Sequence, residues 1–315
     1  MIIQRMNMPD LALPATAATL NGAAMLPELG VIRVAGDEAA KFLQGQLTQD
    51  VALLKPGHSH LAAFCNPKGR MLASFIALKR AEDDILLICS QDLLAAVLKR
   101  LSMFVLRAKA KLSDASAQFA LHGLIGEAAI QGERGESTVE GLNLCPLAPA
   151  DGAPRALRVA PADAPSPPIP AIDSALWRWA DVRSGVAMVT QPVVEAFVPQ
   201  MLNYESVGGV NFKKGCYPGQ EVVARSQFRG AIKRRAFVAQ VDGAAQAGQE
   251  VFSSTDPEQP CGTIALAATA PGGGTAVIVS LQTAALERVD ELAVGAPGGP
   301  TMSGWQIPYP LLADI

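Results

Sequence analysis

The stretch KKGCYPGQEVVAR, residues 213–225, places one cysteine between two lysines and a proline–glycine turn. Pro218 suits the first turn of a helix, because the N–H that proline lacks would have no partner there. The predicted helix would direct its positive end toward Cys216, and Lys213 and Lys214 would add two positive charges. Both features stabilise a thiolate over a thiol. The stretch therefore predicts a reactive, accessible cysteine just before a helix.

The other four of the five cysteines lack this combination of features. Cys65 and Cys89 end apolar runs, which predicts buried packing residues, and Cys145 and Cys261 lie beside prolines and give no signal. No C-x-x-C pair occurs, so no zinc ribbon or intrinsic iron–sulfur site is expected. Separate, unpaired cysteines are typical of a reducing compartment, and we expect a cytoplasmic protein without a metal of its own.

Composition places the chain among globular proteins. Half of its 315 residues are hydrophobic and 17% are charged. The net charge of −3 argues against direct binding to tRNA over a broad surface, although a local basic patch is compatible with it. No apolar run is long enough to cross a bilayer, so no membrane association is expected. Residues 1–25 are alanine-rich but broken by Asp10 and Pro14, which predicts a loose N-terminal arm.

Residues 26–235 mix strand and helix patterns, which predicts an α+β region. VIRVAG (31–36) and DILLICS (84–90) resemble buried strands, whereas the residues after Ser90 are apolar at helical spacing. The proline- and alanine-rich segment 146–170 is expected to be a long surface loop. Residues 236–315 contain short strands separated by glycine and proline turns, which predicts a C-terminal β-barrel domain.

The central motif, KGCYPGQE (214–221), resembles the K-G-C-Y-x-G-Q-E signature of the YgfZ family of folate-binding proteins. These proteins are relatives of the glycine cleavage T-protein, an aminomethyltransferase. GDEAAKFLQGQLTQDV (36–51) and CNPKGRM (65–71) match the same family, so the resemblance covers most of residues 30–310.

The resemblance implies three domains around a central opening that binds tetrahydrofolate or a one-carbon derivative. Within residues 26–235 it suggests two interleaved subdomains. It also implies a role in the assembly or repair of iron–sulfur proteins, with an indirect effect on tRNA modification. Cys216 would be the working thiol, facing the opening, and Lys214 would tune it. The rest of the motif loop comprises Gly215, Tyr217, Gly219, Gln220 and Glu221.

A folate offers paired N–H donors on its amino-pyrimidine edge and carries an anionic glutamate tail. The carboxylates expected to accept those donors are Asp181, Glu205 and Glu221. Relatives often carry a glutamate where this chain has Arg183, so the identity of the pterin-binding carboxylate stays open. A basic cluster is expected to hold the glutamate tail; it comprises Arg225, Arg229, Lys233, Arg234 and Arg235.

Two other functions are compatible with the sequence. One is a tetrahydrofolate-dependent aminomethyltransferase of the glycine cleavage type, although T-proteins lack the cysteine in the corresponding loop. The other is a non-enzymatic binder of tRNA or protein. Whether the chain catalyses a transferase-like reaction therefore stays open.

Overall fold

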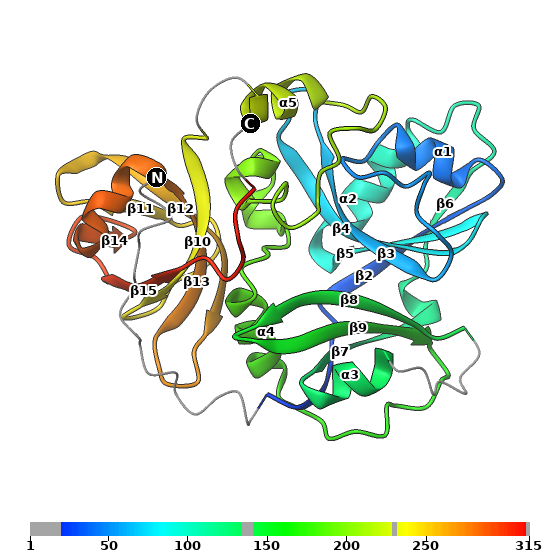
Figure 1. Cartoon of the computed structure of the whole chain (residues 1–315), viewed down its shortest axis with the longest axis horizontal. Coiled ribbons are helices and arrows are strands. Elements are labelled where there is room, and N and C mark those ends of the chain that lie inside the picture. The colour runs from blue at the N-terminus through cyan, green and yellow to red at the C-terminus, as the bar shows by residue number, and fades with distance from the viewer. Residues whose placement is uncertain (1–19, 134–140, 229–231, 313–315) are drawn as a thin grey trace.

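The computed structural model describes residues 20–133, 141–228 and 232–312, which form three antiparallel sheets with helices between and around them (Figure 1). Two sheets are interleaved along the chain, because the first strand, β1, pairs with strands that follow the whole of the other sheet. Within the described residues, no helix is long and apolar enough to cross a membrane.

The first sheet has the order β3-β4-β5-β2-β6. Its strands are β2 (Leu29–Ala35), β3 (His58–Cys65), β4 (Met71–Ala81), β5 (Asp84–Ser90) and β6 (Lys111–Asp114). Helix α1 (Ala39–Gln44) follows β2, and α2 (Gln91–Ser102) follows β5. Helix α2 buries Leu93, Leu94, Val97 and Leu101, as its helical spacing predicts.

The second sheet has the order β1-β7-β9-β8. Its strands are β1 (Gly22–Met25), β7 (Phe119–Ile125), β8 (Asn143–Ala150) and β9 (Ala153–Pro161), with α3 (Glu127–Glu133) packed on β7 and β9 and a short 3₁₀ turn (Ser116–Gln118) before β7. The predicted loop over 146–170 is therefore wrong for most of its length. Strand β8 lies at the sheet edge, where Pro146 can lack an N–H without breaking the ladder.

The predicted N-terminal arm also differs from the structure. Gly22–Met25 pair with β7, so the last residues of the range 1–25 belong to a sheet and not to an arm. Residues 1–19, where the rest of the arm was expected, lie outside the described residues.

The third sheet has the order β14-β11-β12-β13-β10-β15 and curls into a half-barrel. Its strands are β10 (Arg234–Val241), β11 (Glu250–Ser253), β12 (Asp256–Thr269), β13 (Thr275–Gln282), β14 (Leu292–Val294) and β15 (Met302–Gln306). One face, with Val238 and Ile278, joins the central core, whereas Phe237 and Trp305 pack in a separate core on the other face. A 3₁₀ segment, Thr283–Glu291, packs against the second core.

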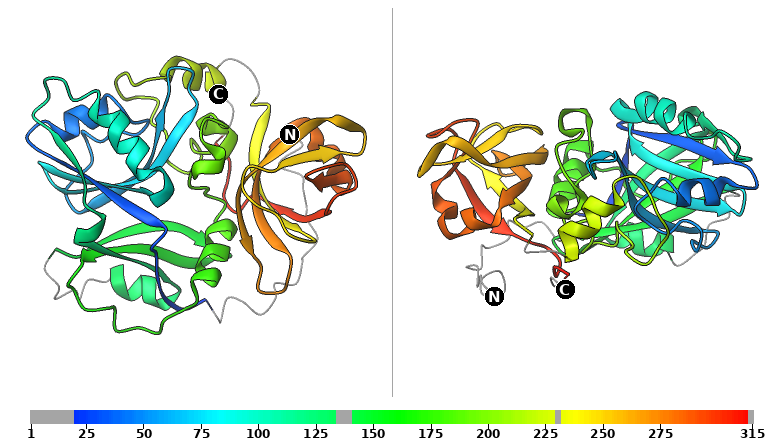
Figure 2. Two further views of the ribbon diagram at one scale, coloured as in Figure 1. Left: turned by 180° about the vertical axis from the view of Figure 1, so that it is seen from behind. Right: turned by 90° about the horizontal axis from the view of Figure 1, so that it is seen from above.

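Helices and turns join the third sheet to the other two (Figure 2). Helix α4 (Ser174–Arg183) packs against β12 and β13 on one side and against β8 on the other. Two short 3₁₀ turns, Gln191–Val193 and Pro199–Leu202, lead to α5 (Gln220–Phe228), which precedes β10. Helix α4 thus lies between the second and third sheets.

Candidate functional site

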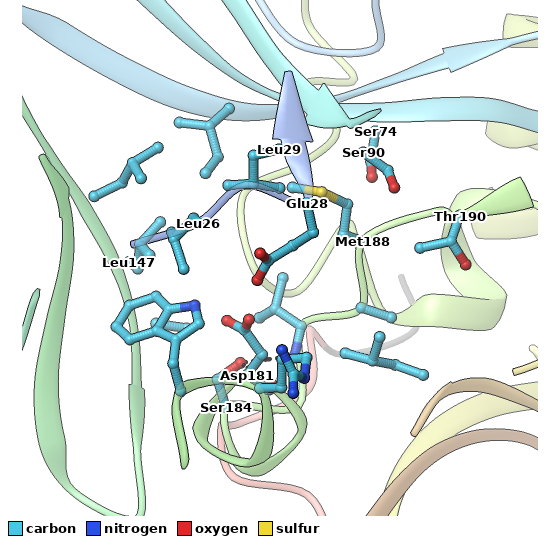
Figure 3. Close-up of a pocket in the computed structure, with 18 of the residues that line it drawn as sticks. Leu26, Glu28, Leu29, Ser74, Ser90, Leu147, Asp181, Ser184, Met188 and Thr190 are labelled. Atoms are coloured by element: carbon cyan, nitrogen blue, oxygen red, sulfur yellow. Dashed lines mark hydrogen bonds between the residues drawn. The ribbon is translucent and has the colours of Figure 1, made fainter. Parts of the chain in front are cut away.

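A cavity of about 610 Å³ lies where the three sheets meet (Figure 3). This volume is typical of sites for small organic ligands. Its apolar wall comes from every sheet and includes Leu29, Ile76, Leu147, Leu157, Trp177 and Leu266. A few polar side chains interrupt that wall, so a ligand with one flat apolar part and a few polar edges fits its chemistry.

Asp181 projects from α4 into this cavity, as Figure 3 shows. Arg155 on β9 donates from its Nη2 atom to the Asp181 carboxylate, and the Arg155 guanidinium carbon lies 4.3 Å from the centre of the Trp177 ring. The Asp181 side chain is 37% exposed, but to a cavity enclosed by protein on most sides. This burial raises the pKa of the Asp181 carboxyl, and the neighbouring Arg155 charge opposes the rise.

Glu28 is a cavity residue that the sequence did not reveal. It lies in the turn between β1 and β2, and its carboxylate points across the cavity toward Asp181 (Figure 3). Among the described residues, its carboxylate has no hydrogen-bond or ion-pair partner. The third acidic residue in the wall, Asp92, is engaged by Ser90 and by the backbone N–H of Gln191. Glu28 is thus the cavity carboxylate left available for a ligand.

Arg183 occupies the position where relatives often carry a glutamate, and Asp151 of the same chain binds its side chain. Its guanidinium makes three hydrogen bonds to Asp151, at 2.7, 2.8 and 3.0 Å. Asp151 begins the β8–β9 turn with a positive φ of 46°. Arg183 therefore connects α4 to that turn, and a carboxylate at the cavity comes from elsewhere in the chain.

Glu205 and Glu221, the other two predicted pterin carboxylates, lie outside the described wall of the cavity. Glu205 is buried and forms an ion pair with the buried Arg235. Glu221 is exposed on α5 and pairs with Arg225 one helical turn later, at 2.9 Å. The negative charges of Glu205 and Glu221 are thus balanced by arginines of the protein and need no ligand.

The predicted basic cluster is also dispersed in the structure. Arg235 is buried beside Glu205, and Arg234 donates to the backbone carbonyl of Cys261. Lys233 is exposed and Arg225 is paired on α5, while Arg229 lies outside the described residues. The described cations that line the cavity are instead Arg155 and Arg178. The Nε atom of Arg155 is buried and has no hydrogen-bond partner among the described residues.

Cys216 is the exposed cysteine of the five, and the other four are buried. Burial raises the pKa of Cys65 and of Cys89 to about 12, and that of Cys145 to about 11. These thiols therefore stay protonated at neutral pH. The expectation that Cys65 and Cys89 are packing residues agrees with these positions.

Lys214 is buried, not exposed beside the cysteine in solvent. Its Nζ atom donates to the backbone carbonyls of Gln44 and Leu47, both at 2.5 Å, at the C-terminal end of α1. Burial lowers the pKa of the Lys214 ammonium to about 8, whereas nearby Asp50 and Cys216 act in the opposite direction. Lys214 therefore anchors the cysteine loop to α1 and still lies near the thiol.

The KGCYPGQE motif (214–221) and the CNPKGRM motif (65–71) meet at Gly219. This glycine has a φ of 81°, and a Cβ atom there would lie 2.5 Å from the carbonyl oxygen of Asn66 and 2.6 Å from the Cα of Gly69. The turn over residues 66–70, which joins β3 to β4, therefore approaches the loop before α5 at backbone contact distance. Only glycine permits both this contact and this backbone conformation.

Tyr217 and Gln220 have structural surroundings in this loop. The Tyr217 ring is buried, with Lys214 Nζ 5.0 Å from its centre, and Gln220 begins α5. Neither residue belongs to the described wall of the cavity. The position of Tyr217 therefore suits a side chain that anchors the loop better than one that stacks on a ligand in the cavity.

Buried tyrosines occur both in the cavity wall, at Tyr204, and in the cysteine loop, at Tyr217. Tyr204 lines the cavity, and its hydroxyl donates to the Ala187 carbonyl at 2.6 Å. The pKa values of Tyr204 and Tyr217 are both raised, chiefly by burial and also because Cys65 lies close to each of them. Among the described residues, Cys216 is not one of those that line this cavity, and that it faces a bound folate stays a prediction.

The described residues contain no group of three or more His, Cys, Asp or Glu side chains placed to hold a metal ion. The chemistry available here is therefore an enclosed apolar cavity with one unpaired carboxylate, and an exposed thiol on a firmly anchored loop.

Comparison with known proteins places this arrangement in a family. Residues 19–132 match the GCVT N-terminal domain family. The tRNA-modifying protein YgfZ of Hamiltonella defensa is 31% identical over 245 residues, which cover 72% of this chain and 70% of that protein. The protein of the same name from Edwardsiella ictaluri is 31% identical over 232 residues, covering 65% and 67% of the two chains.

The fold has a solved counterpart as well. The glycine cleavage system aminomethyltransferase T from Bartonella henselae superposes with a TM-score of 0.67 over 91% of this chain and 86% of that chain, at 14% identity. The similarity in sequence and fold, together with the KGCYPGQE loop, shows that this chain belongs to the YgfZ family.

Proposed function

We propose that this chain is a folate-binding accessory protein for the assembly or repair of iron–sulfur proteins, which supports tRNA modification indirectly. Relatives of the family carry the name tRNA-modifying protein. The observation that carries the proposal is the cavity at the junction of the three sheets, with its apolar wall and its unpaired Glu28 carboxylate. Free thiols suit a reducing cytoplasm, where we place the protein.

The cavity residues fit a folate. A carboxylate accepts two parallel N–H donors well, so Glu28 would take the amino-pyrimidine edge of the pterin. Trp177 and the leucines would contact the flat ring. Arg178, exposed at the cavity wall, would meet the glutamate tail. A bound folate would supply a one-carbon carrier at this site.

Cys216 would act on the client protein. One thiolate cannot hold a cluster alone, because iron–sulfur clusters are normally held by four ligands. Its exposure allows the sulfur to take one iron position transiently while the client supplies the others, or to attack one sulfur of a client S–S bond and displace the other sulfur as a thiolate. Lys214 and Gly219 hold the loop in place during this exchange.

Titration calorimetry with 5-formyltetrahydrofolate tests the cavity. We expect binding by the wild type, tighter binding of polyglutamylated forms, and a roughly 10- to 100-fold weaker affinity for Glu28→Gln, because the amide cannot accept two N–H donors. Glu287→Gln, at an exposed position on the third domain, should bind like the wild type. An absence of heat and of any thermal shift at millimolar folate would remove the folate part of the proposal.

A further inference from the structure

The segment 99–111 forms an exposed surface that combines apolar and positively charged side chains. It runs from the last turn of α2 through a loop to the start of β6. Three of its apolar side chains face solvent: Leu106 is 87% exposed, Met103 67% and Phe104 45%. Clustered exposed apolar side chains of this kind mark a surface that contacts another molecule.

Five cations surround these apolar side chains: Lys99, Arg100, Arg107, Lys109 and Lys111. All five are exposed, and none forms an ion pair within the described part of the chain. No aspartate or glutamate occurs between Asp92 and Asp114. In a chain with a net charge of −3, this segment is a local positive surface, with Glu38 as the acidic side chain that contacts it at Lys109.

The end of the loop at Lys109 is anchored to Glu38. The backbone N–H of Lys109 donates to the Glu38 carboxylate at 2.9 Å, and the backbone N–H of Glu38 donates back to the Lys109 carbonyl at 3.1 Å. Gly36 allows this close approach, because a Cβ atom there would lie 2.3 Å from the Lys109 carbonyl oxygen. This anchor reduces the backbone entropy that residues near Lys109 would lose when a partner binds, which favours binding.

Helix α1 connects this surface to the cysteine loop. Glu38, just before α1, contacts Lys109, whereas Lys214 binds the carbonyls at the other end of the same helix. Six residues of helix span roughly 9 Å. A protein bound to segment 99–111 would thus lie within reach of Cys216.

We propose that segment 99–111 docks an acidic protein that has an apolar cleft, and holds it beside the Cys216 loop. The five cations complement an acidic partner, and aliphatic side chains such as Leu106 and Met103 need an apolar pocket to enter. Nucleic acid would instead favour several aromatic rings for base stacking, and Phe104 is the one aromatic side chain of this segment. The apolar area is one short turn, whereas membrane-bound segments bury a longer apolar face.

The test is photo-crosslinking in the native host, with a benzoylphenylalanine at position 106 of the full chain and, as a control, at the exposed position 287 on the third domain. Adducts are identified by mass spectrometry, and the captured protein is purified and its affinity for the full chain measured. We expect an acidic protein captured at position 106 and not at 287. Its affinity should fall with salt and weaken roughly 10-fold or more in Arg107→Glu/Lys111→Glu and in Leu106→Ser.

These variants change exposed side chains, so their melting temperatures and their folate affinities should match the wild type. Adducts with RNA or lipid, equal capture at both positions, or an affinity unchanged by charge reversal would each overturn the proposal. Docking at segment 99–111 does not require folate in the cavity, so docking and folate binding are tested independently.

Discussion

Replacing Gly219 with alanine is expected to destabilise the protein by about 3 kcal/mol, since the new methyl group would meet backbone atoms that cannot move aside. Its Cβ would lie 2.5 Å from the Asn66 carbonyl oxygen and 2.7 Å from the Gly69 nitrogen, and the residue would also have to keep a φ of 81°. The loop before α5 and the 66–70 turn would have to separate. Urea denaturation followed by far-ultraviolet circular dichroism measures the change.

Gly215, in the same loop, provides the matched control. It has no atom within 4 Å of an added Cβ and is not among the glycines with positive φ. The free energy of unfolding of Gly215→Ala should therefore lie within about 0.5 kcal/mol of the wild-type value. If both variants lost the same free energy of unfolding, the contact between Gly219 and the 66–70 turn would not be the cause of the loss.

Lys214→Ala is expected to cost about 3 kcal/mol at neutral pH, because it leaves the carbonyls of Gln44 and Leu47 without their donor and removes a buried aliphatic stem. Lys213→Ala changes the exposed neighbouring lysine and should alter the free energy of unfolding by less than about 0.5 kcal/mol. Chemical denaturation in reducing buffer compares the variants.

The loss in Lys214→Ala should grow with pH. The pKa of Lys214 is about 8 in the folded protein and 10.5 by reference, so between these values the unfolded chain binds more protons than the folded one. The wild type therefore gains stability as pH rises through this window, by at most about 1.4 kcal/mol per pH unit, and the variant does not share the gain. A difference between wild type and variant that is the same at pH 7 and pH 9 would contradict the assigned burial.

Features that depend on residues close together in the chain could be predicted from the sequence. The exposed position of Cys216 and the helix after Pro218 depend on neighbours in the chain, and both are present. The curled C-terminal sheet follows from the spacing of short strands and turns. The prediction of a loop over 146–170 was wrong because composition does not show which strand lies at a sheet edge. At an edge, Pro146 is acceptable in a strand.

The cavity was less predictable, because its residues come together only in the folded chain. Glu28 lies in an ordinary turn with no motif around it, and its role depends on α4 lying opposite. Arg235 belonged to an apparent basic cluster in the sequence, yet its partner Glu205 is thirty positions away. Local charge counts cannot show which cations are already neutralised across the fold.

Rescue of a deletion strain tests the central claim most directly, namely that the exposed thiol of Cys216 acts on iron–sulfur clients. Wild type, Gly215→Ala, Cys216→Ser and Cys216→Ala would be expressed at equal levels, and the activities of iron–sulfur enzymes and the level of thiolated tRNA measured. Because Cys216 is exposed and does not belong to the cavity wall in the described chain, both of its variants should fold and bind folate normally. We expect wild type and Gly215→Ala to restore the activities and Cys216→Ser and Cys216→Ala not to restore them; full rescue by Cys216→Ala would show that the thiol is not needed.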